Sequence, residues 1–142
     1  MHWLKEESCI VVKHRKENSM PDRQEKNIQE IILGKVPSKS NCYKVTTICS
    51  HASLGKTKAM KEYEQHFFLQ CRHRGLKIKG FFTLTVKVFY ENNRPDLDNS
   101  LKVILDCLQQ CKVIDNDRYC TEIHASKHID KANPRIEIDI TY

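Results

Sequence analysis

Residues 82–90 place a hydrophobic side chain at every second position, and the positions between them are mostly polar. Because successive side chains on a β-strand point to opposite faces, this period predicts a strand with one face against a hydrophobic core. The β-branched and aromatic residues that dominate the segment are also favoured in strands. The chain is therefore expected to build a sheet, and the core side of this strand is expected to carry Phe82, Leu84, Val86, Val88 and Tyr90.

Two other segments have the spacing of amphipathic helices. The first runs from Lys58 for about four turns and ends at a basic turn followed by Gly75, a typical stop signal. The second is entered through Pro95 and ends before Val113. Their hydrophobic positions are Met60, Tyr63, Phe67 and Cys71 in the first, and Leu97, Leu101, Ile104, Leu105 and Leu108 in the second.

Three more extended segments complete the predicted fold. Residues 28–36 are largely hydrophobic and β-branched, and the segment 37–41 after them reads as a polar, basic loop. Near the C-terminus, residues 119–127 are weakly patterned, whereas residues 135–141 alternate clearly. We therefore expect an α+β fold, a sheet with two main α-helices.

Length and composition agree with a single globular domain. A chain of 142 residues has room for one domain of ordinary size. Its hydrophobic content of 39% and charged content of 30% are globular, and its hydrophobic runs are too short to span a bilayer. We expect a cytoplasmic protein with no membrane association. The domain is expected over residues 28–142, after a charged, flexible N-terminal extension at 1–27.

The charge balance and the cysteines exclude little by themselves. Lysine and arginine outnumber aspartate and glutamate by 24 to 18, which permits contacts with nucleic acid phosphates without establishing them. The seven cysteines are odd in number and contain no Cys-x-x-Cys pair, so free buried thiols are expected. A zinc site is the less favoured alternative, because two of its candidate ligands lie beside core positions of the second helix; the four candidates are Cys107, Cys111, Cys120 and His124.

A short motif at residues 54–57 suggests the end of a phosphate-binding loop. The full motif needs a glycine five residues before Gly55, and Ser50 stands at that position. The chain is therefore not expected to contain such a loop.

The start of the second helix carries the strongest chemical signal. Asp96 and Asp98 lie two residues apart at the junction of a strand and a helix, where two carboxylates can share a cation. Magnesium prefers hard oxygen ligands and is usually held by one or two carboxylates with water and phosphate. Asp117, beyond the end of the helix, is the expected third acid. Lys102 follows Asp98 by one helical turn, where it could stabilise charge on a phosphate.

Each of these residues also has an ordinary structural explanation. Asp96 after Pro95 suits a helix N-cap. Asp98 and Lys102 have the order of an exposed i,i+4 ion pair, worth about 0.2–0.5 kcal/mol. Asp115 and Asn116 suit a turn. Spacing alone therefore leaves a metal site and a plain helix entrance both open.

A resemblance adds to this pattern. The string Arg94-Pro-Asp-Leu-Asp-Asn-x-x-Lys102, an apolar helix through Asp106, and then Val113-Ile114-x-Asn116-Asp117 resemble the RusA family of Holliday junction resolvases. Residues 34–43 resemble that family's first strand and the loop after it, and residues 133–139 resemble its last strand. The resemblance extends from near Ile28 to the end of the chain.

This resemblance implies a homodimer with a mixed sheet, which resolves four-way DNA junctions by paired symmetric nicks during recombination and repair. It implies dependence on Mg²⁺, with Mn²⁺ as an alternative ion, a nucleoid-associated protein, and a phage or prophage origin. The catalytic acids and metal ligands map onto Asp96, Asp98 and Asp117, and the essential lysine maps onto Lys102. Residues expected to support the site from around it are Asn99, Asp106, Asp115 and Asn116.

One departure from the family pattern concerns Asn116. The family commonly has two adjacent aspartates where this chain has Asn116-Asp117. An amide brings no charge, so weaker metal affinity is expected, partly compensated by Asp115. A second hypothesis therefore stays open, a branched-DNA-binding protein with weakened catalysis.

Contacts with DNA phosphates are expected from basic residues outside the hydrophobic faces. Each of them equally suits a solubilising surface position. No aromatic residues are spaced as a base-stacking platform, which favours recognition of DNA structure over sequence. The candidate DNA-binding residues are Lys35, Lys39, Lys44, Lys56, Lys58 and Arg94.

Overall fold

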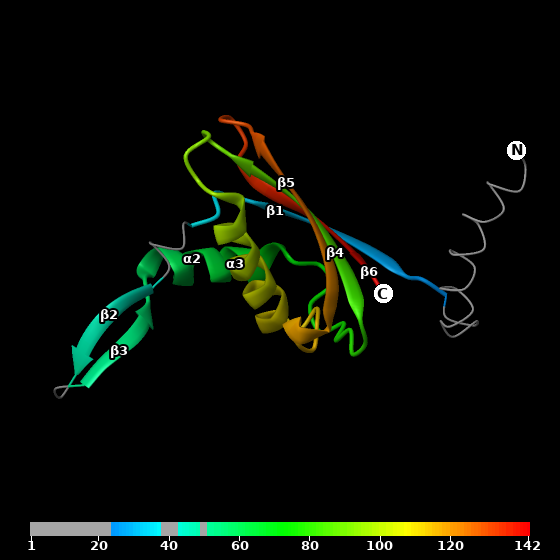
Figure 1. Ribbon diagram of the computed structural model, residues 1–142, viewed down its shortest axis with the longest axis horizontal. Coiled ribbons are helices and arrows are strands. Elements are labelled where there is room, and N and C mark those ends of the chain that lie inside the picture. Colours follow the sequence, from blue (N-terminus) through cyan, green and yellow to red (C-terminus); the bar gives the residue numbers. More distant parts are fainter. Residues whose placement is uncertain (1–23, 38–42, 49–50) are drawn as a thin grey trace, which may run out of the picture.

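The computed structural model describes residues 24–37, 43–48 and 51–142 (Figure 1). Four strands form the main sheet, and two further strands form a separate hairpin. In chain order the elements are β1 (Asn27–Leu33), β2 (Tyr43–Ile48), β3 (His51–Lys56), α2 (Lys58–Gln70), β4 (Phe82–Tyr90), α3 (Leu97–Gln110), the short 3-10 helix η2 (Asp117–Tyr119), β5 (Cys120–Ile129) and β6 (Arg135–Thr141).

The main sheet is mixed and has the strand order β1-β6-β4-β5. β4 pairs in parallel with β5 and antiparallel with β6, which in turn pairs antiparallel with β1. The register sets Leu84 opposite Ile140, so the hydrophobic positions of neighbouring strands share one face. Both helices pack against that face and join one hydrophobic core. The predicted α+β fold, a mixed sheet with two helices, is confirmed.

The elements predicted from periodicity agree closely with the structure. β4 and β6 have the predicted bounds, and α2 and α3 bury the predicted positions Phe67, Ile104 and Leu108 completely. β1 ends at Leu33, earlier than predicted, because the chain turns at Gly34 with a φ of +114°, a conformation that favours glycine. None of the described helices is long and hydrophobic enough to cross a bilayer.

The hairpin formed by β2 and β3 was not predicted. It projects away from the main sheet and leads directly into α2 (Figure 1). The rejected phosphate-loop motif lies here, with Gly55 in β3 and Thr57 at the N-cap of α2. The Thr57 side chain accepts a hydrogen bond of 3.3 Å from the Met60 N–H. These residues therefore end a strand and begin a helix.

The segment after α3 is fixed by a remote part of the chain. The backbone N–H groups of Lys77 and Ile78 donate to the carbonyls of Lys112 and Val113 at 2.8 and 3.0 Å. The Asp115 N–H donates back to the Ile78 carbonyl at 3.0 Å. Because these bonds join two segments far apart in sequence, they fix the entry to the acidic residues at 115–117.

Candidate active site

Asp96 and Asp98 lie at the N-terminal end of α3. Asp96 occupies the N-cap position, but its side chain makes no capping hydrogen bond to the described backbone. Both side chains are exposed, and neither forms a hydrogen bond or ion pair with another described side chain. The N-terminal end of a helix also favours negative charge. The structural role considered for Asp96 thus accounts for its position but not for its free carboxylate.

Two buried hydroxyl groups hold this helix end against the sheet. Tyr90, the last residue of β4, donates a hydrogen bond of 3.3 Å to the Asp96 carbonyl and hydrogen-bonds the Ser100 hydroxyl. Tyr90 and Ser100 are 2% and 3% exposed. Burial raises the pKa of Tyr90, the Ser100 hydrogen bond lowers it, and the negative charges of Asp98 and Asp96 raise it. The backbone that carries the two aspartates is therefore anchored from below.

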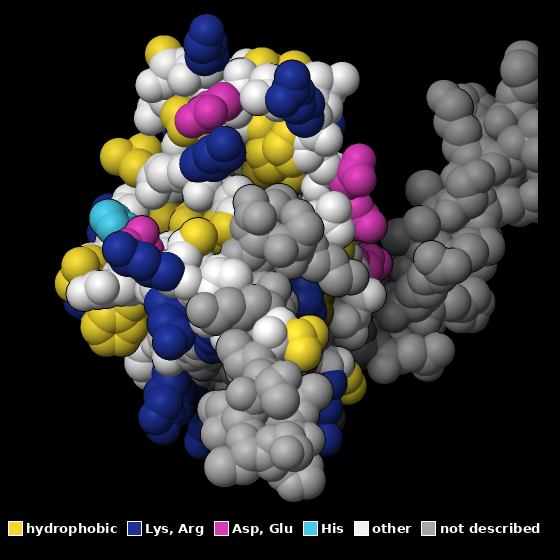
Figure 2. All heavy atoms as spheres, turned by 90° about the vertical axis from the view of Figure 1, so that its left-hand side faces the viewer, with side chains coloured by type: hydrophobic (Ala, Val, Ile, Leu, Met, Phe, Trp, Pro, Cys, Tyr) yellow, Lys and Arg dark blue, Asp and Glu magenta, His cyan; other side chains and the backbone are white. Residues whose placement is uncertain are grey.

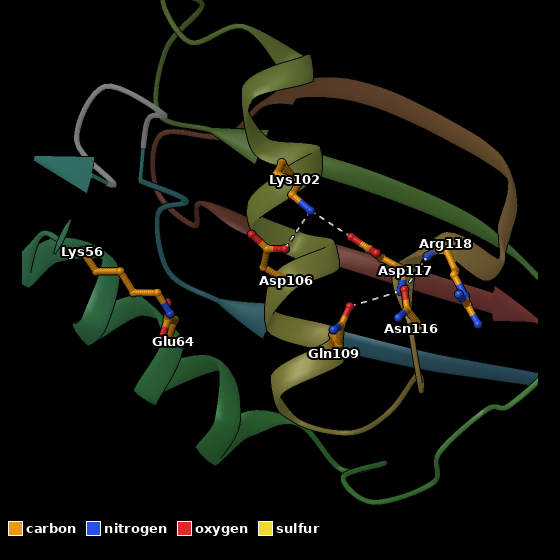
Figure 3. A network of polar contacts seen from close by, with 8 residues as sticks. All are labelled: Lys56, Glu64, Lys102, Asp106, Gln109, Asn116, Asp117 and Arg118. Carbon is orange, nitrogen blue, oxygen red and sulfur yellow. Dashed lines mark hydrogen bonds and ion pairs between the residues drawn. The ribbon is translucent and has the colours of Figure 1, made fainter. Parts of the chain in front are cut away.

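Lys102 lies one turn further along α3 and joins two acidic residues (Figure 3). Its Nζ is 2.9 Å from an Asp117 oxygen and 3.0 Å from an Asp106 oxygen. The hydrogen bond to Asp117, and then the bond to Asp106, raises the pKa of Lys102 to about 12. The lysine is therefore a protonated, positively charged group beside the helix end.

Asp117 is positioned by the short helix η2 and by the last turn of α3. Its N–H donates to the Gln109 side-chain oxygen at 3.2 Å, and its carboxylate reaches Lys102 (Figure 3). Sequence reasoning did not identify Gln109. The i,i+7 spacing between Lys102 and Gln109 on one helix face was the available signal, since both lie toward the segment after the helix.

Asn116 has a structural role that spacing did not reveal. It is the N-cap of η2, and its side-chain oxygen accepts a hydrogen bond of 3.0 Å from the Arg118 N–H. An aspartate would cap this turn equally well. The amide therefore preserves the local fold while removing one negative charge. Of the remaining supporting candidates, Asp115 is exposed and Asn99 is half-buried.

The structure groups the predicted site residues into two sets. One is Asp96 with Asp98 at the start of α3, and the other is Lys102 with Asp106 and Asp117. Within residues 24–37, 43–48 and 51–142, no three His, Cys, Asp or Glu side chains lie close enough to hold one ion. The donor chemistry nevertheless fits magnesium, because Asp96 and Asp98 offer hard oxygen ligands that no described cation neutralises.

Three of the candidate DNA-binding lysines form ion pairs with glutamates. Lys35 pairs with Glu91 at 3.5 Å, Lys56 with Glu64 at 2.8 Å and Lys58 with Glu62 at 3.8 Å. Arg94 is exposed. Lys44 lies in β2 with a side chain that the structure does not describe, and Lys39 lies outside the described residues. Figure 2 shows basic side chains spread over one side of the molecule.

A cavity of about 550 Å³ lies next to the segment that leads into α3. It is bounded by the end of β1, by α2 and by the turn after β4, and both Lys35 and Arg94 line it. Two DNA-binding candidates that are far apart in sequence are therefore brought to one hollow next to Pro95, the residue before Asp96.

The cysteines of the less favoured zinc alternative lie mainly in the core. Cys107 and Cys111 are 1% and 4% exposed, and both are free thiols, as is the half-buried Cys120. Burial raises the pKa of Cys107. The predicted buried thiols on α3 are confirmed.

One protein family matches most of the chain. No curated protein matches the chain. The family described as Endodeoxyribonuclease RusA matches residues 34–141, a range that begins just after β1 and ends with β6. This range includes both sets of candidate site residues. The chain therefore belongs to the RusA family of endodeoxyribonucleases.

Proposed function

We propose that this nuclease resolves Holliday junctions in DNA by paired, symmetric nicks and requires a divalent cation, Mg²⁺ by preference and Mn²⁺ as an alternative. The observation that carries the proposal is the arrangement on α3. Two exposed carboxylates without described partners occupy the helix start, and a charged lysine held by two acids lies one turn away. A cation held by such carboxylates and a nearby ammonium group both stabilise the negative charge that develops during phosphodiester hydrolysis.

In this proposal, Asp96 and Asp98 hold the cation, and when DNA is bound Asp117 joins them through the carboxylate oxygen that does not contact Lys102. Bound magnesium supplies positive charge beside the phosphate oxygens and acidifies a water molecule for attack. Asp96 and Asp98 suit this role because they are exposed and carry no described counter-ion. Their repulsion of DNA phosphates also makes binding at this point depend on a cation.

Lys102 is proposed to stabilise negative charge on the scissile phosphate or the leaving oxygen. Its pKa of about 12 keeps the ammonium group protonated at neutral pH. Asp106 and Asp117 fix its position, at 3.0 and 2.9 Å from Nζ. Since an ammonium group has three donors, one donor remains for a phosphate oxygen while both acids stay bound.

Symmetric cleavage is proposed to come from a homodimer. A four-way junction has two equivalent strands to cut, and a two-fold dimer presents two identical active sites. The basic residues Lys35 and Arg94 beside the cavity, together with Lys39, Lys44, Lys56 and Lys58, are proposed to contact the phosphates of the arms.

The decisive experiment incubates the full chain with an end-labelled four-way junction, with and without Mg²⁺, and maps nicks on all four strands. The wild type is expected to make symmetric nicks only with the ion. Asp98→Asn is expected to lose cleavage by at least about 100-fold while still binding the junction. Glu122→Gln is the matched control, because it neutralises a carboxylate that is 64% exposed on β5, outside both sets of site residues.

Three results would count against the proposal. Equal cutting by Asp98→Asn and wild type would remove the carboxylate from the reaction. Tight binding by the wild type without any ion-dependent nicking would identify a junction-binding protein with weakened catalysis. Sedimentation of the wild type as a monomer at the assay concentration would exclude the paired mechanism.

A further inference from the structure

A partly exposed aromatic surface lies next to Asp117 in the chain. Phe81, just before β4, is 60% exposed, and its ring meets the Tyr119 ring at a centroid distance of 5.8 Å and an angle of 71°. The Arg118 guanidinium lies over the other ring, with Cζ 4.9 Å from the Tyr119 centroid. Residues that are far apart in sequence thus form one surface, which we call the 81/118/119 surface.

Local geometry explains why these side chains turn outward. Phe82 is 2% exposed and points into the core, so the preceding side chain faces the other way. The pairing of β4 with β5 shifts register here, from Phe82 opposite Cys120 to Thr83 opposite Glu122. Such bulges redirect side chains and are frequent beside active sites. The 81/118/119 surface therefore lies where β4 and β5 begin.

The surface is directly connected to the candidate active site through η2. Asp117, Arg118 and Tyr119 together make up η2. Asp117 reaches Lys102 from this turn (Figure 3), while Tyr119 packs against the core. A molecule that contacts Tyr119 therefore lies two residues from the acid proposed to join the reaction.

The Arg118 guanidinium is available for an anion. Its Nη2 donates to the Tyr119 hydroxyl at 2.9 Å, and it forms no ion pair with a carboxylate in the described part of the chain. A guanidinium has five N–H donors, so most remain free. Arg135 shows the contrast, because it lies 3.8 Å from the Phe89 centroid but pairs with Asp130 and Glu137.

We infer that the 81/118/119 surface binds an unpaired nucleotide of branched DNA beside the cleavage site. The base stacks on the exposed Phe81 ring and meets the Tyr119 ring edge-on, because the two rings are inclined at 71°, and Arg118 contacts a phosphate of the same strand. An exposed Phe81 ring and a half-buried Tyr119 ring next to a cation without a carboxylate partner suit this ligand, which has a flat face and a negative backbone. The inference rests on the proposed function, because the base that it places on this surface is the one next to the proposed cut.

The test is a cycle of substitutions in both protein and DNA. The full chain carries Asp98→Asn so that the junction stays intact, and binding is measured by fluorescence anisotropy. Junctions lacking one base at each position near the crossover are compared with the intact junction. At one position, loss of the base is expected to weaken binding about tenfold, the typical worth of a stacked base.

Phe81→Ala and Tyr119→Ala are each expected to weaken binding to the intact junction by a similar factor. Neither should weaken binding further once that base is absent, since the two losses remove the same contact. Tyr119→Phe, which keeps the ring, should retain most of the affinity. Arg118→Ala should reduce the salt dependence of binding by about one phosphate contact.

A matched pair elsewhere on the surface provides the control. Arg74 lies 4.7 Å from the Phe68 centroid, and Phe68 is 48% exposed on α2. Phe68→Ala and Arg74→Ala should leave junction affinity unchanged. If Tyr119→Ala does not fold, Phe81→Ala carries the test, because its ring is largely outside the core.

Three outcomes would overturn the inference. They are unchanged affinity in Phe81→Ala and Tyr119→Ala, losses that are equal with and without the base, and a shift from dimer to monomer without coupling to any base. The last result would make the surface a contact between copies of the chain. Cleavage of the same junction by the wild type is scored separately, so failure of this inference and failure of the proposed function are distinguishable.

Discussion

Lys102 Nζ lies 2.9 Å from an Asp117 carboxylate oxygen, although 15 positions of sequence separate the two residues. The contact joins the middle of α3 to η2, and Asp106 completes it at 3.0 Å. Lys102 is 65% exposed, so solvent reaches this ion-paired group. The lysine is thus accessible to a phosphate while its position is fixed by two acids.

Asp106→Asn is expected to lower the pKa of Lys102 while leaving it above the ordinary lysine value. Asp106 provides the second of the two hydrogen bonds that raise this pKa to about 12, and the stronger bond to Asp117 remains. Because the folded value is raised, Lys102 keeps its charge at neutral pH and loses it only as pH rises through that value. NMR titration of the lysine side chains measures the change. Glu62→Gln, which removes the acid beside Lys58 on α2, is the control and should leave the titration of Lys102 unchanged. An unchanged Lys102 titration in Asp106→Asn would contradict the role given to Asp106.

Tyr90→Phe is expected to loosen the start of α3. The change removes the hydroxyl that bonds the Asp96 carbonyl and the Ser100 side chain, at a cost of about 1 kcal/mol in the free energy of unfolding. Magnesium affinity should fall several-fold, because Asp96 is less well held. Denaturant unfolding and calorimetric titration with Mg²⁺ measure the two effects. Tyr142→Phe should change neither, because its hydroxyl has no hydrogen-bond partner among the described residues.

The parts of the fold that sequence predicted are those with a strong local period. β4 alternates strictly and α3 has a regular hydrophobic face, so each could be recognised without knowledge of its neighbours. The hairpin of β2 and β3 mixes polar residues and small residues such as Ser53 and Gly55, and it lies outside the main sheet. Its pairing is therefore not encoded as alternation.

The candidate site divides in the same way. Asp96, Asp98 and Lys102 share one helix, so their spacing was sufficient to group them. The contact between Lys102 and Asp117 depends on hydrogen bonds that join Ile78 to the segment after α3. The meeting of Phe81 with Tyr119 depends on the parallel pairing of β4 with β5. Neither contact is local, which is why spacing indicated no aromatic surface.

Glu30→Gln is expected to destabilise the fold by about 1–3 kcal/mol. Glu30 is 1% exposed in β1, accepts hydrogen bonds of 2.8 and 3.1 Å from the Arg72 N–H, and lies 2.7 Å from His73 Nδ1. An amide keeps one acceptor oxygen but replaces the other with a donor, which then faces another donor and weakens these part-buried hydrogen bonds. Urea unfolding measures the loss. Glu122→Gln, at an exposed position, should stay within about 0.5 kcal/mol of wild type, and equal stability of both variants would refute the prediction.

Tyr63→Phe is expected to leave stability at pH 8 unchanged or to increase it by up to about 1 kcal/mol. Tyr63 is 6% exposed, and its buried hydroxyl has no hydrogen-bond partner in the described structure. The variant therefore removes a group whose desolvation is not compensated. A loss of stability at pH 8 would show that the hydroxyl has a partner.

The same variant should differ from wild type at alkaline pH. Burial raises the pKa of Tyr63 far above its ordinary value, and electrostatic interactions with Cys107 and Tyr90 raise it further. The unfolded chain ionises near pH 10 while the folded chain stays protonated, so the contribution of Tyr63 is complete below pH 10 and is lost as pH rises further. The loss is about 1.4 kcal/mol per pH unit. Between pH 8 and pH 11, urea unfolding should therefore show a smaller decrease in stability in Tyr63→Phe than in wild type.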